Sequence, residues 1–267
     1  MTERSRDDAS TTSDSGSIAS FFDGMSATRN ALFRANPVLD YEQRVRSGAI
    51  LDRLRPTAGE TILDIGCGNA RDMIRILEAG ARIVGVDLSE GMIDQARREL
   101  QAAGHPDVRL EVGDATQMPF PDASFDKLLC SEVIEHIPDA DAAVREIRRV
   151  LKPGGMLVLS TPNRTSWYGF DRYILWTRVL RRRWNHPFDN WRTMSELTSL
   201  LTRQGLEVST TATVCYLPGF LATYFLPRLL QAAVLGCMGP AEGLARRIAP
   251  GNGYLLVVTA RRPTATQ

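Results

Sequence analysis

The sequence is poor in histidine and cysteine and almost neutral in charge. Its 267 residues include 3 histidines and 4 cysteines, and the formal net charge at pH 7 is +1. No two cysteines form a CxxC pair or show zinc-ligand spacing, so we expect no metal and reduced thiols in a cytoplasmic protein. The near-zero net charge gives no electrostatic basis for nucleic acid as a partner.

A signal-peptide core and an uninterrupted membrane-spanning stretch are also missing. Residues 1–17 are rich in Ser, Thr, Asp and Arg, which predicts a disordered tail. The apolar stretch Val214–Met238 carries one charge, Arg228, but two prolines and two glycines interrupt it. Three interpretations stay open for it: a lid over an apolar substrate, a segment resting on a membrane surface, or a contact between two copies of the chain.

What the sequence does contain is a strand, a glycine turn, a helix and a second strand. The buried strand Thr61–Ile65 leads into Gly66 and Gly68, and Ile83–Asp87 forms the next strand. Glycines without side chains permit a tight turn and let a ligand approach the backbone. Asp87 stands where a nucleotide-binding acid holds ribose hydroxyls. The pattern predicts half of a nucleotide-binding βαβ unit.

Asp64 is the unusual residue of this unit. A carboxylate two residues before Gly66 would repel a pyrophosphate, but it favours the ammonium or sulfonium end of S-adenosylmethionine. In addition, Arg71 falls where a dinucleotide fingerprint has its third glycine. The residues therefore favour a methyl donor over a dinucleotide.

Two later strands end in polar residues suited to the same ligand. Asp114 follows a predicted strand, Val108–Val112, and could accept a hydrogen bond from an adenine amino group, while the backbone amide of Ala115 donates to a ring nitrogen. Ser131 ends the predicted strand Phe125–Ser131 and offers its backbone carbonyl to the donor's amino group.

Six motifs then occur in a familiar order: DIGCGNA, GVDLS, GDA, PFPDASFD, EVIEHIPD and LKPGGMLVLSTPN. From about Glu60 to Asn163 the chain resembles the core of class I S-adenosylmethionine-dependent methyltransferases. The EHIPD, STPN and PFDNW elements resemble the ubiquinone-biosynthesis O-methyltransferase group, and the match fades in the C-terminal third. The resemblance implies a Rossmann-like α/β fold with a mainly parallel seven-stranded sheet, helices on both faces and a helical substrate cover.

The resemblance also completes the expected cofactor site. An arginine before the core binds the methionine carboxylate in the resembling enzymes; Arg46 fits slightly better than Arg44, and a solvated arginine is the alternative. Met92 could cover the adenine or belong to the core. The residues expected to bind S-adenosylmethionine are Arg46, Asp64, Gly66, Cys67, Gly68, Asp87, Leu88, Met92, Asp114, Ala115 and Ser131.

His136 is the candidate catalytic residue. It lies just beyond the fourth strand, and a neutral imidazole suits removal of a proton from a hydroxyl acceptor. Glu135 could orient the imidazole or point to solvent. Alternatively, His136 packs against or hydrogen-bonds the next loop. If the acceptor is an amine that is already neutral, no base is needed and His136 only lines the pocket.

The chain divides into five predicted parts. After the tail come helices at 18–55, the cofactor-binding core at 56–163, an insertion at 164–192, and a C-terminal part at 193–263 with an apolar insertion at about 215–250. The first insertion holds all four tryptophans among many arginines. It suits either a membrane interface or a packed helix with a solvated basic face.

We therefore expect methyl transfer from S-adenosylmethionine to a small, lipophilic or aromatic molecule, most simply at a hydroxyl oxygen. Nitrogen or carbon methylation is the nearest alternative, because this core serves many acceptors. A non-catalytic protein that only binds the donor is another. Peripheral membrane contact and a homodimer stay open.

Overall fold

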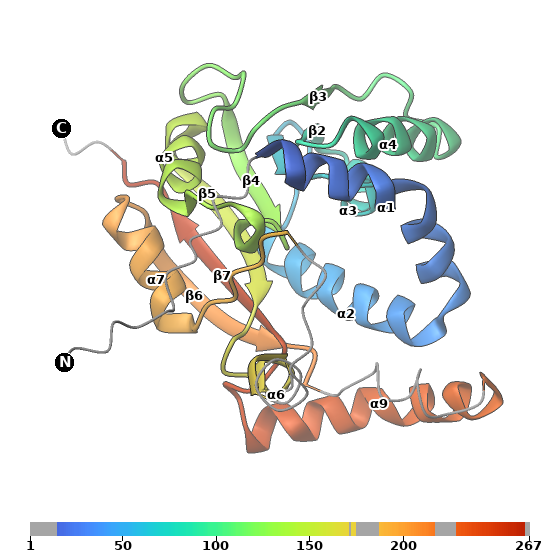
Figure 1. Cartoon of the computed structure of the whole chain (residues 1–267). Helices are drawn as coiled ribbons and strands as arrows, with labels where there is room; N and C mark the ends of the chain where they lie inside the picture. Colours follow the sequence, from blue (N-terminus) through green and yellow to red (C-terminus); the bar gives the residue numbers. More distant parts are fainter. Residues whose placement is uncertain (1–14, 171, 175–186, 217–227, 265–267) are drawn as a thin grey trace, which may run out of the picture.

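A computed structural model describes residues 15–170, 172–174, 187–216 and 228–264 (Figure 1). Seven strands form one sheet in the order β3-β2-β1-β4-β5-β7-β6, and β7 runs antiparallel to both of its neighbours. The strands are β1 (Thr61–Ile65), β2 (Arg82–Asp87), β3 (Leu110–Val112), β4 (Phe125–Ser131), β5 (Leu151–Pro162), β6 (Glu207–Val214) and β7 (Leu255–Arg261). The predicted mainly parallel, seven-stranded sheet is confirmed.

Helices precede the sheet and alternate with its strands. They are α1 (Ser15–Ala35), α2 (Pro37–Leu54), α3 (Arg71–Glu78), α4 (Glu90–Ala102), the short 3-10 turn η1 (Ile134–His136), α5 (Ala140–Val150), α6 (Trp167–Phe170), α7 (Met194–Arg203) and α9 (Arg228–Ile248). Helix α1 begins at Ser15, so the last three residues of the predicted disordered tail are helical instead. Residues 1–14 of that tail lie outside the described residues.

The strands bury both of their faces, which explains their nearly continuous apolar sequences. Along β1, Leu63 belongs to one apolar cluster and Ile62 to the other, and in β4 Leu128 and Leu129 divide in the same way. Helices α5 and α7 cover one face, while α2, α3 and α4 cover the opposite face. The sheet is thus the middle layer of three (Figure 1).

The strand order places a ligand site at one edge of this layer. From β1 the chain builds outward through β2 and β3, and then returns to the other side of β1 with β4. Because the loops after β1 and β4 diverge to opposite faces at this switch point, they leave a crevice at the carboxyl ends of the strands. The glycine turn after β1 and the EHIPD segment after β4 both lie at that crevice.

The two insertions are described in part. Helix α6 lies in the first insertion and α9 in the second, whereas residues 175–186 and 217–227, including Trp176 and Trp184, lie outside the described residues. None of the helices in the described ranges is long and apolar enough to cross a membrane.

Candidate methyl-donor site

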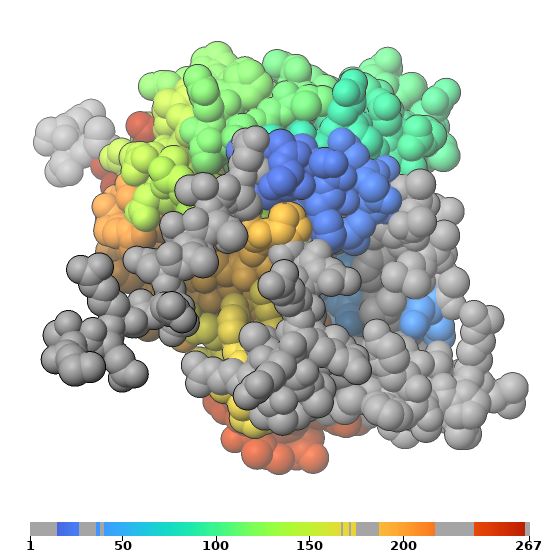
Figure 2. Space-filling model, in the orientation of Figure 1, coloured from blue at the N-terminus to red at the C-terminus, as the bar shows by residue number. Residues whose placement is uncertain are grey.

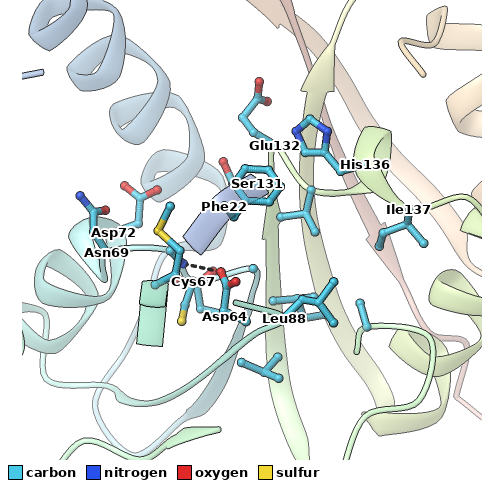
Figure 3. Close-up of a pocket in the computed structure, with 18 of the residues that line it drawn as sticks. Phe22, Asp64, Cys67, Asn69, Asp72, Leu88, Ser131, Glu132, His136 and Ile137 are labelled. Carbon is cyan, nitrogen blue, oxygen red and sulfur yellow. Dashed lines mark hydrogen bonds between the residues drawn. The ribbon is translucent and has the colours of Figure 1, made fainter. Parts of the chain in front are cut away.

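A pocket opens at the switch point, and the residues predicted from the sequence meet in it (Figure 3). It is lined by the loops after β1, β2, β3 and β4 and by residues of α1 and α2. All twelve predicted site residues line it: Arg46, Asp64, Gly66, Cys67, Gly68, Asp87, Leu88, Met92, Asp114, Ala115, Ser131 and His136. Residues that are up to about 90 positions apart in the sequence therefore meet in a single cavity.

The glycine turn has a backbone that side chains would strain. Gly66 and Gly68 have φ values of +67° and +52°. A Cβ atom on Gly66 would lie 2.3 Å from Cγ2 of Val133, whereas one on Gly68 would meet nothing within 4 Å. Gly66 is therefore required both by its conformation and by the close approach of the loop after β4.

Asp87 fixes this turn from the neighbouring strand. Its Oδ2 accepts a hydrogen bond of 2.9 Å from the backbone N–H of Gly68, and its Oδ1 accepts one of 3.0 Å from the backbone N–H of Ser89. The sequence suggested only a role in holding ribose. The structure adds that the same carboxylate orders the loops after β1 and β2.

A buried charge cluster lies below the turn. Burial, together with repulsion from Asp72 and Asp87, raises the pKa of Asp64 well above its usual range. Nη2 of Arg46 lies 3.6 Å from Oδ2 of Asp72, which also accepts a hydrogen bond from the Ser47 hydroxyl at its other oxygen. A cationic ligand would lower the pKa of Asp64 and favour the ionised carboxylate, so the three neighbouring aspartates suit such a ligand.

Arg46, and not Arg44, is the pocket arginine. The side chain of Arg44 is 67% exposed and pairs with Asp40, whereas that of Arg46 is 13% exposed. Nε of Arg46 is buried and has no hydrogen-bond partner in the structure. Arg46 lines the pocket, and an unsatisfied buried guanidinium N–H is costly, so a ligand carboxylate that bound this side chain would stabilise it.

Asp114, at the predicted adenine end of the pocket, already accepts hydrogen bonds from nearby residues. Oδ1 of Asp114 accepts from the backbone N–H and the hydroxyl of Thr116, at 2.8 and 2.7 Å, and its Oδ2 accepts from the Ser15 hydroxyl at 3.2 Å. Met92 is 2% exposed, so it belongs to the core and lines the pocket as well. Core packing of Met92 is therefore observed, and its contact with the adenine stays a prediction.

At the opposite end, a chain of hydroxyls leads to Glu132. The hydroxyls of Ser131 and Ser160 lie 3.0 Å apart, and the Ser160 hydroxyl donates to Oε1 of Glu132 at 3.0 Å. Burial and repulsion from Glu135 raise the pKa of Glu132, and burial also raises that of Glu135. Glu132 has a φ of +58°, a conformation that a glutamate rarely adopts and that directs its side chain into the pocket lining.

His136 stands beside Glu132 at this end (Figure 3). Its Nδ1 lies 3.2 Å from the backbone carbonyl of Phe188, so this nitrogen carries the proton, and Nε2 lies 3.7 Å from Oε1 of Glu135. Glu135 is 1% exposed and accepts a hydrogen bond from the Thr161 hydroxyl. Of the two alternatives for Glu135, the buried position next to the imidazole is therefore the correct one.

Residues at the end of the first insertion lie next to Nδ1 of His136. Asp189 lies 3.9 Å from Nδ1 of His136, and it accepts hydrogen bonds from Arg172 (2.6 Å) and from Nε1 of Trp191 (2.9 Å). The Arg172 guanidinium also stacks 4.6 Å from the centre of the Trp191 ring. Arg172, Asp189 and Trp191 thus form a buried cluster, whereas Arg178, Arg181, Arg182 and Arg183 of the predicted basic face lie outside the described residues.

Several lining residues were not predicted as site residues, although some of them belong to the motifs. They are Ile18 and Phe22 of α1, Gln43 of α2, Asn69, Arg71, Asp72, Gly113, Glu132, Val133 and Ile137. The described parts of the two insertions supply no lining residue. Their predicted role as the substrate cover stays a prediction, and α1 covers the pocket in the described structure. Among the described residues, no group of three or more His, Cys, Asp and Glu side chains is placed to hold a metal ion.

Known proteins share this arrangement. The methyltransferase domain family matches residues 63–159. The ubiquinone biosynthesis O-methyltransferase of Pseudomonas paraeruginosa is 34% identical over 176 residues, which cover 63% of this chain and 73% of that protein. A demethylmenaquinone methyltransferase of Geobacillus kaustophilus is 32% identical over 55% of this chain and 65% of its own length.

Solved structures show the same fold. A geranyl diphosphate C-methyltransferase from Streptomyces coelicolor, in complex with Mg²⁺, geranyl diphosphate and S-adenosyl-L-homocysteine, aligns with a TM-score of 0.62 at 21% identity, covering 84% of this chain and 82% of that one. A putative methyltransferase bound to the Haloferax volcanii Trm112 activator aligns with a TM-score of 0.65 at 20% identity, covering 91% and 97%.

The chain belongs to the class I S-adenosylmethionine-dependent methyltransferases. The cofactor of this family is S-adenosylmethionine, and the acidic cluster, the close-packed glycine turn and the unpaired Nε of Arg46 fit its cationic, amino-acid-bearing end. The chain spans less than two thirds of the length of several curated relatives, for example 38% of the 27-O-demethylrifamycin SV methyltransferase of Amycolatopsis mediterranei.

Proposed function

We propose that this protein transfers a methyl group from S-adenosylmethionine to a hydroxyl oxygen of a small, lipophilic or aromatic molecule. One observation carries the proposal: the methyl-donor cradle and the His136–Glu132 pair line the same cavity. Methyl transfer is an in-line displacement, so a protein accelerates it mainly by holding donor and acceptor in line and by accepting the acceptor's proton. Residues suited to both requirements line the cavity.

When bound, S-adenosylmethionine supplies an electrophilic methyl group on a positively charged sulfur. In this chain Asp64, Asp87 and the glycine turn would hold the nucleoside and the cationic end, and Arg46 the carboxylate. Because Nδ1 of His136 donates to the Phe188 carbonyl, Nε2 keeps its lone pair and is the nitrogen that would accept the hydroxyl proton. Glu132, with its raised pKa, would hydrogen-bond the acceptor beside it.

The lining of the acceptor end supports an apolar acceptor. Ile18, Phe22, Val133 and Ile137 line the cavity, and the Phe22 ring lies 5.3 Å from the imidazole ring. Two relatives are named for O-methylation, one in ubiquinone biosynthesis and one of rifamycin SV. Apolar walls around a single basic nitrogen suit a phenolic hydroxyl on a hydrophobic skeleton.

Helix α9 supports peripheral membrane contact, where such an acceptor would be found. Leu244 and Ile248 are 59% and 75% exposed, one turn apart, and Arg246 and Arg247 are exposed beside them. Apolar and basic side chains on the same exposed turn suit the surface of an anionic bilayer.

The first test uses methyl-labelled S-adenosylmethionine, the purified full chain and an extract of the source cells, with products divided between organic and aqueous phases. Label in the organic phase, lost after O-demethylation with boron tribromide, is the expected result. Label in the aqueous phase would contradict the lipophilic acceptor, and label that resists O-demethylation would indicate carbon or nitrogen methylation. Donor binding without transfer to any fraction would favour the non-catalytic alternative.

The role of His136 has a separate test. We expect His136→Ala to lower turnover by about 100-fold or more with little change in donor affinity, because it removes only the proton acceptor. His105→Ala is the matched control, since His105 is not a pocket residue. Unchanged turnover in His136→Ala would remove His136 from the chemistry and leave it as a lining residue.

A further inference from the structure

Helix α1 covers one side of the donor pocket. Ile18 and Phe22 on this helix line the cavity, and Ile18 is only 5% exposed. In the space-filling view the described part of α1 (blue) lies on the molecular surface (Figure 2), and Phe22 lies among the pocket residues in the close-up (Figure 3). A ligand the size of S-adenosylmethionine would therefore lie between α1 and the sheet.

One side chain joins α1 to the wall of the pocket. Oδ1 of Asp23 accepts a hydrogen bond of 2.5 Å from the Ser89 hydroxyl and one of 3.0 Å from the backbone N–H of Gly91. Ser89 is also the N-cap of α4, where its oxygen accepts from the backbone N–H of Met92 at 3.0 Å. Asp23 thus holds α1 to the turn that carries Leu88 and Met92, both of which line the donor site.

The approach of the two helices is close at this point. A Cβ atom on Gly91 would lie 3.1 Å from Oδ1 of Asp23, 3.1 Å from the hydroxyl oxygen of Ser26 and 3.3 Å from Cα of Asp23. Since almost any side chain at position 91 would push α1 away, Gly91 and Asp23 form one docking contact.

Helix α1 also touches both ends of the pocket, and its connection to the rest of the fold is short. Ser15 hydrogen-bonds Asp114 at the predicted adenine end, and Phe22 contacts His136 at the acceptor end. Only Asn36 separates α1 from α2, which begins at Pro37. Proline interrupts the helical hydrogen bonding here, so α1 can change its angle without disturbing α2.

We propose that Asp23 is a positioning residue that docks α1 over the bound donor, and that release of this contact is the step that admits S-adenosylmethionine and frees S-adenosylhomocysteine. The inference rests on the proposed function only in taking the ligand to be the methyl donor and its product. Asp23 touches no ligand itself. It acts through α1, which places Phe22 against His136 and closes the pocket.

The test is stopped-flow binding of S-adenosylhomocysteine to the full chain. Asp23→Ala removes the acceptor of two hydrogen bonds, so we expect release about tenfold faster, with an association rate that is unchanged or higher. Asp23→Asn keeps an acceptor oxygen and should fall between Asp23→Ala and the unaltered protein. Asp94→Ala, which removes an exposed acid from α4, is the control. A slower association with unchanged release would mean that Asp23 only supports the fold, and would overturn the proposal.

A second variant tests the same contact from α4. Gly91→Ala adds a methyl carbon that would lie 3.1 Å from Oδ1 of Asp23 and 3.3 Å from its Cα, so it should displace α1. Release of S-adenosylhomocysteine from this variant should also be about tenfold faster. Unchanged release in Gly91→Ala would overturn the proposal. Absence of binding to the unaltered protein would instead overturn the proposed function.

Discussion

The carboxylate of Asp87 accepts a 2.9 Å hydrogen bond from the backbone N–H of Gly68, 19 residues earlier in the chain. This contact ties the end of β2 to the glycine turn after β1. The pocket floor is therefore ordered by the residue that is also expected to hold the ribose.

We expect Asp87→Ala to weaken S-adenosylhomocysteine binding by about 100-fold, because two backbone N–H donors lose their acceptor and the ribose loses its own. Asp87→Asn keeps one acceptor oxygen and should lose less. Titration calorimetry measures both affinities. The thermal midpoint of the free protein should also fall in Asp87→Ala, and a midpoint that stays unchanged would contradict the ordering role.

Gly66 and Gly68 should respond differently to a methyl group. Gly66→Ala puts Cβ within 2.3 Å of Val133 at a positive φ, so a loss of donor affinity of about 100-fold is expected. The Cβ atom added by Gly68→Ala has no atom within 4 Å, so the only cost is the strain of its positive φ. A loss of donor affinity of about tenfold is therefore expected. The same calorimetric titration compares the two variants. Equal losses would mean that the approach of Val133 is not what constrains Gly66.

Arg46 can be tested with a ligand that lacks the amino-acid moiety. Arg46→Met should weaken S-adenosylhomocysteine by on the order of 100-fold, because the carboxylate loses a charged hydrogen-bond donor. 5′-Methylthioadenosine, which has no carboxylate, should bind both proteins alike. Arg44→Met serves as the control, since Arg44 is exposed. An equal loss of affinity for both ligands in Arg46→Met would contradict the proposal that Arg46 binds the carboxylate.

The raised pKa of Glu132 predicts how stability depends on pH. Its pKa rises from 4.5 to about 8 in the folded protein, so between these values the folded state binds more protons than the unfolded state. Stability must then fall as the pH rises through this window. Glu132→Gln should reduce the fall between pH 5 and 8 by on the order of 2 kcal/mol, measured by urea unfolding at each pH.

Glu78→Gln is the control for this effect, because Glu78 is an exposed glutamate on α3. The pH slope of this control should match that of the unaltered protein. If the pH slope of Glu132→Gln equalled the slopes of the unaltered protein and of Glu78→Gln, Glu132 would be ionised in the folded protein throughout the window.

The sequence was most informative where local motifs meet the sheet edge. Asp64, Gly66, Asp87 and Asp114 each end a strand or begin the following turn, and parallel strands carry such positions to one edge. The position of the pocket could therefore be predicted from motif order. Arg46 could be selected over Arg44 only weakly, because the two positions differ in helical orientation and not in residue type.

The rest depends on contacts between distant helices. Phe22 and Asp23 lie in a helix with no motif, and only the packing of α1 against α4 brings them to the pocket. Glu132 was overlooked because its orientation comes from a positive φ, which the sequence does not reveal for a glutamate. Likewise, the contact of Phe188 and Asp189 with His136 spans more than 50 residues.

The methyl-donor assignment is tested most directly by calorimetric titration of the full chain with S-adenosylhomocysteine, with NADH titrated in parallel. We expect one site per chain for S-adenosylhomocysteine, with a dissociation constant of roughly 10 µM or below, and no binding of NADH. Binding of NADH in place of S-adenosylhomocysteine, or of neither ligand, would contradict the assignment of the pocket to the methyl donor.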